Sequence, residues 1–175
     1  MDARTRAARI RLVAFDIDGV MTDGGLHYTD DGREMKTFCV QDGLGLKLLQ
    51  RAGLKLAIVT GRTSKVVAQR AANLGITYVF QGVGDKRATV GGLLGRLGMN
   101  WSECAFMGDD LIDLAVMAQC GLAIAPANAR PLVRERAHAV TDASGGHGAV
   151  REAAEFILAA QGRLDGLVAA YLDLQ

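Results

Sequence analysis

The chain has 175 residues, of which 50% are hydrophobic and 22% are charged. This apolar fraction excludes a chain that is disordered throughout, and the length fits a single domain. Lys and Arg number 20 against 19 Asp and Glu, and the resulting net charge of +1 argues against an electrostatic binder of nucleic acid or of a membrane surface.

The cysteines and the apolar runs bear on the cellular compartment. Cys39, Cys104 and Cys120 are odd in number and form no C-x-x-C pair, so a disulfide framework is not expected. Residues 1–11 are basic and lack the apolar core of a signal peptide. No uncharged apolar run reaches the roughly 18 residues that a membrane helix needs. We therefore expect a cytoplasmic protein without a membrane segment.

The first predicted elements are a strand, a hairpin and a helix. Residues 11–15 follow a frayed N-terminal arm and are typical of a short buried strand that ends in a carboxylate. The Asp-Gly pair at 31–32, between extended flanks, predicts a β-hairpin over 26–28 and 34–38. A helical pattern begins at Asp42, places Leu44, Leu48 and Leu49 on one face, and is closed by Gly53.

Strands and helices alternate along the rest of the chain. The predicted strands span 55–60, 78–81, 104–108, 122–125 and 139–141, and the predicted helices span 64–74, 85–97, 111–119, 131–136, 150–161 and 163–172. This alternation predicts an α/β fold, with a Rossmann-like, mostly parallel sheet and helices on both faces. Such sheets bind their ligands beyond the carboxyl ends of the strands, so the residues just after each strand matter most.

Carboxylates, a hydroxyl and a lysine follow four of these strands. The residues concerned are Asp16, Asp18, Thr60, Lys86, Asp109, Asp110 and Asp113, and Gly61 and Arg62 follow Thr60. Carboxylates gathered at one sheet edge repel one another unless a cation lies among them, and Mg²⁺ is the hard cation that takes such oxygens. A magnesium ion beside a lysine and helix N-termini suits a phosphate ester. These residue types leave hydrolysis and phosphoryl transfer as open alternatives.

Several of these residues also have a purely structural interpretation. Asp85 and Asp110 are each suited to cap a helix N-terminus, and Lys86 could be an ordinary solvated lysine. We interpret the cysteines as small core residues, and His27, His138 and Trp101 as packed or solvated side chains without ligands.

Four short motifs occur in a fixed order at the strand ends. They are Asp-Ile-Asp-Gly-Val at 16–20, Thr-Gly-Arg at 60–62, Lys86, and Gly-Asp-Asp at 108–110 with Asp113. Together they resemble the four motifs of the haloacid dehalogenase superfamily of phosphatases. By this resemblance Asp16 is the nucleophile and Asp18 the general acid and base, and the reaction passes through an aspartyl-phosphate.

The same resemblance implies further roles. Mg²⁺ would be held by Asp16, the backbone carbonyl of Asp18, and Asp109. Thr60 and Lys86 would hold the transferring oxygens. Asp113 would orient the water around the metal or Lys86, and Asp110 would likewise lie outside the direct ligands.

The segments between the motifs are too short for a cap domain. Residues 18–24, 38–46 and 145–152 are similar to one capless subfamily, the 3-deoxy-D-manno-octulosonate 8-phosphate phosphatases, whose product enters lipopolysaccharide synthesis. The resemblance implies a homotetramer in which a neighbouring subunit completes each active site. It also implies sugar contacts from Gly61, Arg62, Gly145, Gly146, His147 and Gly148, with Asp23, Gly24 and Lys47 as weaker candidates.

Several alternatives remain open at this point. We predict one domain over 1–175, with a hairpin flap at about 24–39 and a C-terminal tail at about 145–175. The substrate could instead be a related nonulosonate 9-phosphate or another sugar phosphate. A phosphotransferase or mutase is disfavoured by the absence of a cap. A non-catalytic oligomerisation module is disfavoured because Asp16, Asp18 and Lys86 are all present.

Overall fold

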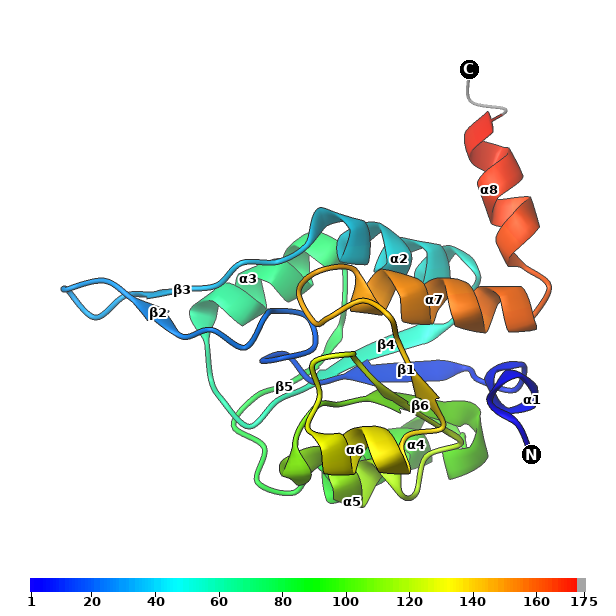
Figure 1. Ribbon diagram of the computed structural model, residues 1–175, viewed down its shortest axis with the longest axis horizontal. Coiled ribbons are helices and arrows are strands. Elements are labelled where there is room, and N and C mark those ends of the chain that lie inside the picture. The colour runs from blue at the N-terminus through cyan, green and yellow to red at the C-terminus, as the bar shows by residue number, and fades with distance from the viewer. Residues whose placement is uncertain (173–175) are drawn as a thin grey trace.

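The computed structural model describes residues 1–172, and its centre is a sheet of six parallel strands. The strand order is β5-β4-β1-β6-β7-β8, so β1 lies between β4 and β6 (Figure 1). Phe15 pairs with Ile58 on one side and with Met107 on the other, and these three strands therefore end side by side. The strands are β1 (Leu12–Phe15), β4 (Lys55–Val59), β5 (Tyr78–Phe80), β6 (Cys104–Met107), β7 (Leu122–Ala125) and β8 (Ala139–Val140).

Helices cover both faces of the sheet, as predicted. α2, α3 and α7 pack on one face, and α4, α5 and α6 pack on the other (Figure 1). Their bounds are α2 (Val40–Arg51), α3 (Lys65–Leu74), α4 (Lys86–Leu97), α5 (Leu114–Met117), α6 (Pro131–Arg136) and α7 (Ala149–Ala160). A short 3-10 helix, η1 (Trp101–Glu103), leads into β6, and Trp101 packs against the core as expected.

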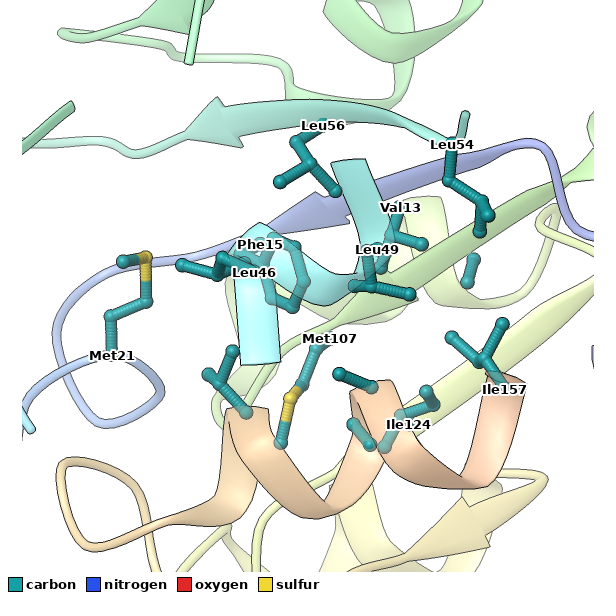
Figure 2. Close-up of a cluster of buried hydrophobic side chains, with 14 of the residues drawn as sticks. Val13, Phe15, Met21, Leu46, Leu49, Leu54, Leu56, Met107, Ile124 and Ile157 are labelled. Atoms are coloured by element: carbon teal, nitrogen blue, oxygen red, sulfur yellow. The ribbon is translucent and has the colours of Figure 1, made fainter. Parts of the chain in front are cut away.

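Two hydrophobic clusters fill the layers between sheet and helices. Val13 and Phe15 of β1 belong to the cluster under α2 and α7, shown in Figure 2, whereas Leu12 and Ala14 belong to the opposite cluster. Successive side chains of a strand point to opposite faces, and for this reason a strand buried on both sides is apolar at every position. The central strand is thus anchored from both faces, which fixes where its carboxyl end lies.

The predicted hairpin is present but shorter than expected. β2 (His27–Tyr28) and β3 (Glu34–Met35) pair antiparallel, and Gly32 takes the positive φ of +79° in the turn between them. Residues Leu26 and 36–38 lie outside the strands. Figure 1 shows the hairpin projecting from the body of the molecule at the end where the strands terminate.

The N-terminal arm is not frayed, and the prediction for it was wrong. Residues Ala3–Ala7 form helix α1, and the Asp2 carboxylate caps it by accepting the amide of Thr5 at 2.7 Å. Ala7 is fully buried in the cluster under α7. A five-residue helix is unstable alone and is held here by this packing, which the local sequence does not reveal.

Two other helix predictions need correction. The helix predicted over 111–119 is a 3-10 turn, η2 (Leu111–Asp113), followed by the short α5, because the carboxylates of Asp110 and Asp113 bind the backbone amides of the turn. Leu44 does not share the buried face of Leu48 and Leu49, since 38% of it is exposed.

The last described helix, α8 (Leu164–Leu172), extends away from the body in Figure 1. None of its residues is fully buried, although Leu164 and Leu167 still pack against the core. Within residues 1–172, no helix is both long and apolar enough to cross a bilayer. All three cysteines are free. Cys104 and Cys120 are buried in the core as expected, and burial raises the pKa of Cys120 to about 12, whereas Cys39 is only partly buried and precedes α2, so the prediction of a core residue was wrong there.

Candidate active site

Three predicted site residues follow three neighbouring strands of the sheet. Asp16 comes directly after β1, Thr60 comes directly after β4, and Asp109 lies two residues after β6. Asp16 and Thr60 are buried, at 5% and 3% exposure, and Asp109 is partly buried. The backbone amide of Asp16 donates to the carbonyl of Met107 at 3.0 Å, which extends the β1–β6 pairing to Asp16. The sheet therefore brings these three predicted residues to one edge, as the motif order required.

Gly19 allows two of the loops to approach each other closely. It has φ +90°, and a Cβ placed on it would lie 2.1 Å from Oδ2 of Asp109. Only glycine takes this backbone conformation at low cost and leaves room for the carboxylate. The glycine in the Asp-Ile-Asp-Gly motif thus lets the loop after β6 pack against the loop after β1.

Three carboxylates form a cluster at this edge. Asp16, Asp109 and Asp113 each offer an oxygen within 4.8 Å of the others. Burial, followed by the charge of Asp113, raises the pKa of Asp16 to about 6. Burial and the charges of Asp113 and Asp16 raise the pKa of Asp109 to about 7. A cation among these groups would relieve the repulsion that raises both values.

Lys86 supplies one positive charge to the cluster. It is 4% exposed, and its Nζ lies 2.9 Å from Oδ1 of Asp16 and 2.6 Å from Oδ1 of Asp113. Burial opposes the charged ammonium, but the carboxylates of Asp16 and Asp113 outweigh it and raise the pKa of Lys86. Asp85 caps α4 by accepting the amide of Ala88, and so fixes the turn from which Lys86 projects.

Asp113 and Asp110 shape the loop after β6. Oδ2 of Asp113 accepts the amides of Asp109 at 3.0 Å and Asp110 at 3.2 Å, and its other oxygen binds Lys86. Asp110 is exposed and caps η2 by accepting the amide of Leu111. Asp113 is therefore placed to hold Lys86 and the loop, while Asp110 has the capping role that was the structural alternative.

The donor set fits a hard divalent cation. Both oxygens of Asp113 are engaged, but Oδ1 of Asp109 is buried without a hydrogen-bond partner. Oδ1 of Asp16 is likewise buried and has only the ion pair with Lys86. Buried carboxylate oxygens without donors are costly unless a cation binds them. Asp16 and Asp109 are thus the side chains available to Mg²⁺.

Asp18 lies apart from that cluster and is paired with cations from other loops. Its Oδ1 binds the ammonium of Lys36, and its Oδ2 lies 3.5 Å from Nε of Arg62. Arg62 also donates from Nη2 to the hydroxyl of Tyr28 at 2.7 Å and to Glu34 at 3.1 Å. Sequence reasoning missed Lys36, Tyr28 and Glu34, because nothing in the motif order indicates that the hairpin folds onto the site.

Thr60 and Gly61 form the start of the loop that carries Arg62. The hydroxyl of Thr60 accepts the amide of Arg62 at 3.4 Å, and the carbonyl of Thr60 accepts the amide of Val83. Gly61 is exposed beside them. The loop is therefore tied to the next strand connection, and Arg62 is held at its outer side.

The Gly145–Gly148 segment packs on the loop after β1 of its own chain. A Cβ on Gly145 would lie 1.9 Å from the carbonyl oxygen of Gly19, and the amide of Gly146 donates to Val20 at 3.1 Å. The side chain of Asn128, which sequence reasoning also missed, bridges Gly145 and the Gly19 carbonyl. The segment is thus held against the loop after β1 by contacts of its own backbone and of Asn128.

The rest of the predicted tail is not peripheral. His147 is exposed, and Gly148 is the residue before α7, whose apolar residues are buried in the core. The tail predicted from residue 145 therefore contains a core helix, and only α8 extends outward.

The weaker candidates for sugar contacts lie in two separate parts of the structure, the loop after β1 and helix α2. Asp23 and Gly24 lie in the loop after β1, where Oδ1 of Asp23 accepts the amide of Gly25 and Gly24 has φ +85°. Lys47 donates to the carbonyl of Leu74 at 2.6 Å and thereby binds the end of α3. The structure does not bring Lys47 together with the other predicted site residues.

Comparison with known proteins agrees with this geometry. Residues 79–152 match the family of haloacid dehalogenase-like hydrolases, a span that includes Lys86 and Asp109. The chain is 47% identical over 165 residues to 3-deoxy-D-manno-octulosonate 8-phosphate phosphatase KdsC of Yersinia pestis, with 94% of this chain and 88% of that protein covered.

Solved structures give the same result. A probable YrbI-family phosphatase of Pseudomonas syringae has a TM-score of 0.96 at 46% identity, covering 98% of this chain and 97% of that one. A 3-deoxy-D-manno-octulosonate 8-phosphate phosphatase of Moraxella catarrhalis, solved with magnesium, phosphate and KDO, has a TM-score of 0.94 at 43% identity, covering 96% and 97%. The carboxylate cluster, the lysine and these similarities lead to one conclusion: this chain belongs to the 3-deoxy-D-manno-octulosonate 8-phosphate phosphatase family of haloacid dehalogenase-like hydrolases.

Proposed function

We propose that the protein is a Mg²⁺-dependent phosphatase that hydrolyses 3-deoxy-D-manno-octulosonate 8-phosphate to the free sugar acid and phosphate. The observation that carries this proposal is the environment of Asp16, a buried carboxylate 2.9 Å from the ammonium of Lys86 and beside an Asp109 oxygen without a partner. A nucleophile, a fixed cation and two carboxylates that can bind a metal ion are what phosphoryl transfer to a carboxylate requires.

In the first step, Asp16 attacks the phosphorus and the phosphate–sugar bond breaks. Asp18, two residues further along the loop, donates a proton to the departing sugar oxygen. Lys86 and the hydroxyl of Thr60 hold the phosphoryl oxygens during transfer. The strand ends keep these groups in fixed relation, which lowers the entropic cost of the reaction.

In the second step, water releases phosphate from Asp16. Asp18, now a carboxylate, accepts a proton from the water, so the group that was the acid becomes the base. Asp113, whose Oδ1 lies 2.6 Å from the ammonium of Lys86, keeps that ammonium in place. The free Asp16 carboxylate is restored for the next turnover.

Asp16 and Asp109 would bind Mg²⁺ through their side chains, and the carbonyl of Asp18 is the predicted third ligand from the protein. When bound, the ion neutralises charge between the nucleophile and the phosphoryl oxygens.

We further propose a homotetramer whose active sites are completed by neighbouring subunits. The segments between the motifs hold no cap domain, and the projecting hairpin, with strands of two residues each, gains stability from pairing with other copies. Arg62 and the Gly145–Gly148 segment would contact the sugar, with Gly61 beside them.

We place the enzyme in the cytoplasm, in the synthesis of the lipopolysaccharide sugar acid. The support is the family of the chain, together with three free cysteines.

The test is phosphate release from the octulosonate 8-phosphate, compared with nonulosonate 9-phosphates and common sugar phosphates, with Mg²⁺ and with EDTA. We expect Mg²⁺-dependent release that is fastest with the octulosonate. Faster release from another sugar acid phosphate would leave the chemistry in place and contradict the proposed substrate.

A further inference from the structure

We propose that Lys36, at the end of the hairpin, is a positioning residue that holds the carboxyl group of Asp18 where it can pass its proton to the sugar oxygen. This inference rests on the proposed phosphatase function and assigns a role within it to a residue outside the four motifs. It also gives the hairpin a part in the chemistry of its own chain, separate from any part in assembly.

The burial of Lys36 is unusual for a residue of this hairpin. Its side chain is 1% exposed, whereas Tyr28 and Met35 are 56% and 55% exposed and the side chain of Arg33 is 80% exposed. Lysine is almost never fully buried unless it is paired. The partners here are Oδ1 of Asp18 and, at 3.4 Å, Oε1 of Glu34.

Each oxygen of the Asp18 carboxylate faces a different cation. Lys36 binds Oδ1, and Nε of Arg62 lies 3.5 Å from Oδ2. The side chain of Arg62 is 43% exposed, which leaves it room to turn toward a substrate once its bonds to Tyr28 and Glu34 are exchanged. The ammonium of Lys36 is enclosed and lacks that freedom, which makes it the fixed one of the two contacts.

Glu34 joins the two cations into one network. Its Oε1 accepts from Arg62 at 3.1 Å and lies 3.4 Å from the ammonium of Lys36. Bonds from Ser64 and Arg62 lower the pKa of Glu34, which keeps it ionised between the two cations. The hairpin thus delivers a carboxylate and an ammonium as a pair, and the ammonium reaches Asp18.

The consequence for catalysis depends on the leaving group. A sugar alkoxide must be protonated as it leaves, and a misplaced acid slows that step. A 4-nitrophenolate leaves without a proton. Loss of a residue that positions the acid must therefore slow cleavage of the sugar phosphate and spare 4-nitrophenyl phosphate, whereas loss of a charge that merely attracts phosphate slows both.

The experiment compares kcat/KM for both substrates in the Mg²⁺-loaded wild type, Lys36→Met and Lys36→Arg, with Arg33→Met as the matched control. This constant reports the steps up to cleavage of the phosphate–sugar bond. We expect Lys36→Met to lower it about 10-fold or more for the sugar phosphate, within the contribution typical of a general acid. For 4-nitrophenyl phosphate we expect less than about a 3-fold fall. Lys36→Arg restores most of the loss, and Arg33→Met changes neither constant.

Equal losses on both substrates, or no loss on either, would overturn the positioning role. Thermal unfolding and gel filtration of each variant identify a hairpin that has failed to fold. If Lys36→Met fails to fold, Lys36→Arg is compared with the wild type instead. A guanidinium that keeps the ion pair with Asp18 must leave the ratio of kcat/KM for the two substrates unchanged. The wild-type rate on the sugar phosphate tests the proposed function separately, since the positioning role depends only on the variant-to-wild-type ratios.

Discussion

The two sides of the active site are built in different ways. Asp16, Lys86 and Asp113 lie on the sheet side and are all 5% exposed or less. Asp16 directly follows β1, whereas Lys86 begins α4 and Asp113 ends η2, and two hydrophobic clusters hold these elements against the sheet. Arg62 and Glu34 lie on the hairpin side, where each strand has two residues and most side chains are exposed. From this comparison we infer that the sheet side serves the phosphoryl chemistry and that the hairpin side, apart from the buried Lys36, serves recognition of the sugar.

The largest expected effect comes from the sheet side. Asp16→Asn removes the nucleophile while keeping the shape of the side chain, so we expect no measurable turnover and an unchanged fold. Phosphate release and circular dichroism measure the two outcomes. Retained activity would mean that another group attacks phosphorus.

A second substitution tests the close approach of the two loops on that side. Gly19→Ala places a methyl group where Oδ2 of Asp109 lies and strains a backbone at φ +90°. We expect a fall in kcat of about 100-fold, the size that a misplaced catalytic group produces, together with a higher Mg²⁺ requirement. Kinetics at several Mg²⁺ concentrations give both values, and wild-type kinetics would show that the loops need not touch.

The hairpin side should respond differently. Arg62→Ala removes the bonds to Tyr28 and Glu34 and the predicted sugar contact. We expect KM for the sugar phosphate to rise about 10-fold, with kcat changed much less and 4-nitrophenyl phosphate nearly unaffected. A fall in kcat on both substrates would instead place Arg62 in the phosphoryl chemistry.

The smallest expected effect is a pH dependence of stability. The pKa values of Asp16 and Asp109 rise on folding to about 6 and about 7, from 3.8, so the metal-free folded state binds protons that the unfolded state has lost. Stability should therefore fall as pH rises from about 4 through about 7.

Magnesium should cancel this loss by binding the ionised carboxylates. We expect Mg²⁺ to raise the Tm by at least about 3 °C more at pH 7.5 than at pH 5, with a smaller difference in Asp109→Asn. Scanning calorimetry with and without Mg²⁺ measures it, and an equal effect of Mg²⁺ at both pH values would contradict a shared metal site.

The sequence predicts the sheet side well and the hairpin side poorly, for a physical reason. Parallel strands are buried on both faces and are therefore apolar at every position. The points at which the apolar runs give way to Asp16, Thr60 and Gly108 thus predict the strand ends. Asp85 and Asp110 cap helices through contacts at most three residues away, and local patterns also predict these.

Lys36 and Asn128 could not be predicted in the same way. Their partners, Asp18 and Gly19, lie 18 and 109 residues away along the chain. Helix α1 was not predicted for a related reason. It is stabilised by tertiary packing on α7 rather than by the helix propensity of its own residues. Contacts between distant segments depend on how the hairpin and loops fold onto the sheet, and no local pattern encodes that.

The most direct test of the account is to locate the phosphoryl group during turnover. The wild-type enzyme is mixed with Mg²⁺ and the octulosonate 8-phosphate, quenched, and reduced with borohydride, which converts an aspartyl-phosphate to homoserine. Fragmentation of the tryptic peptide 12–33 then identifies the converted residue. We expect homoserine at position 16 and none in Asp16→Asn. Conversion at another carboxylate, or an unmodified Asp16 in enzyme that is turning over, would contradict this expectation.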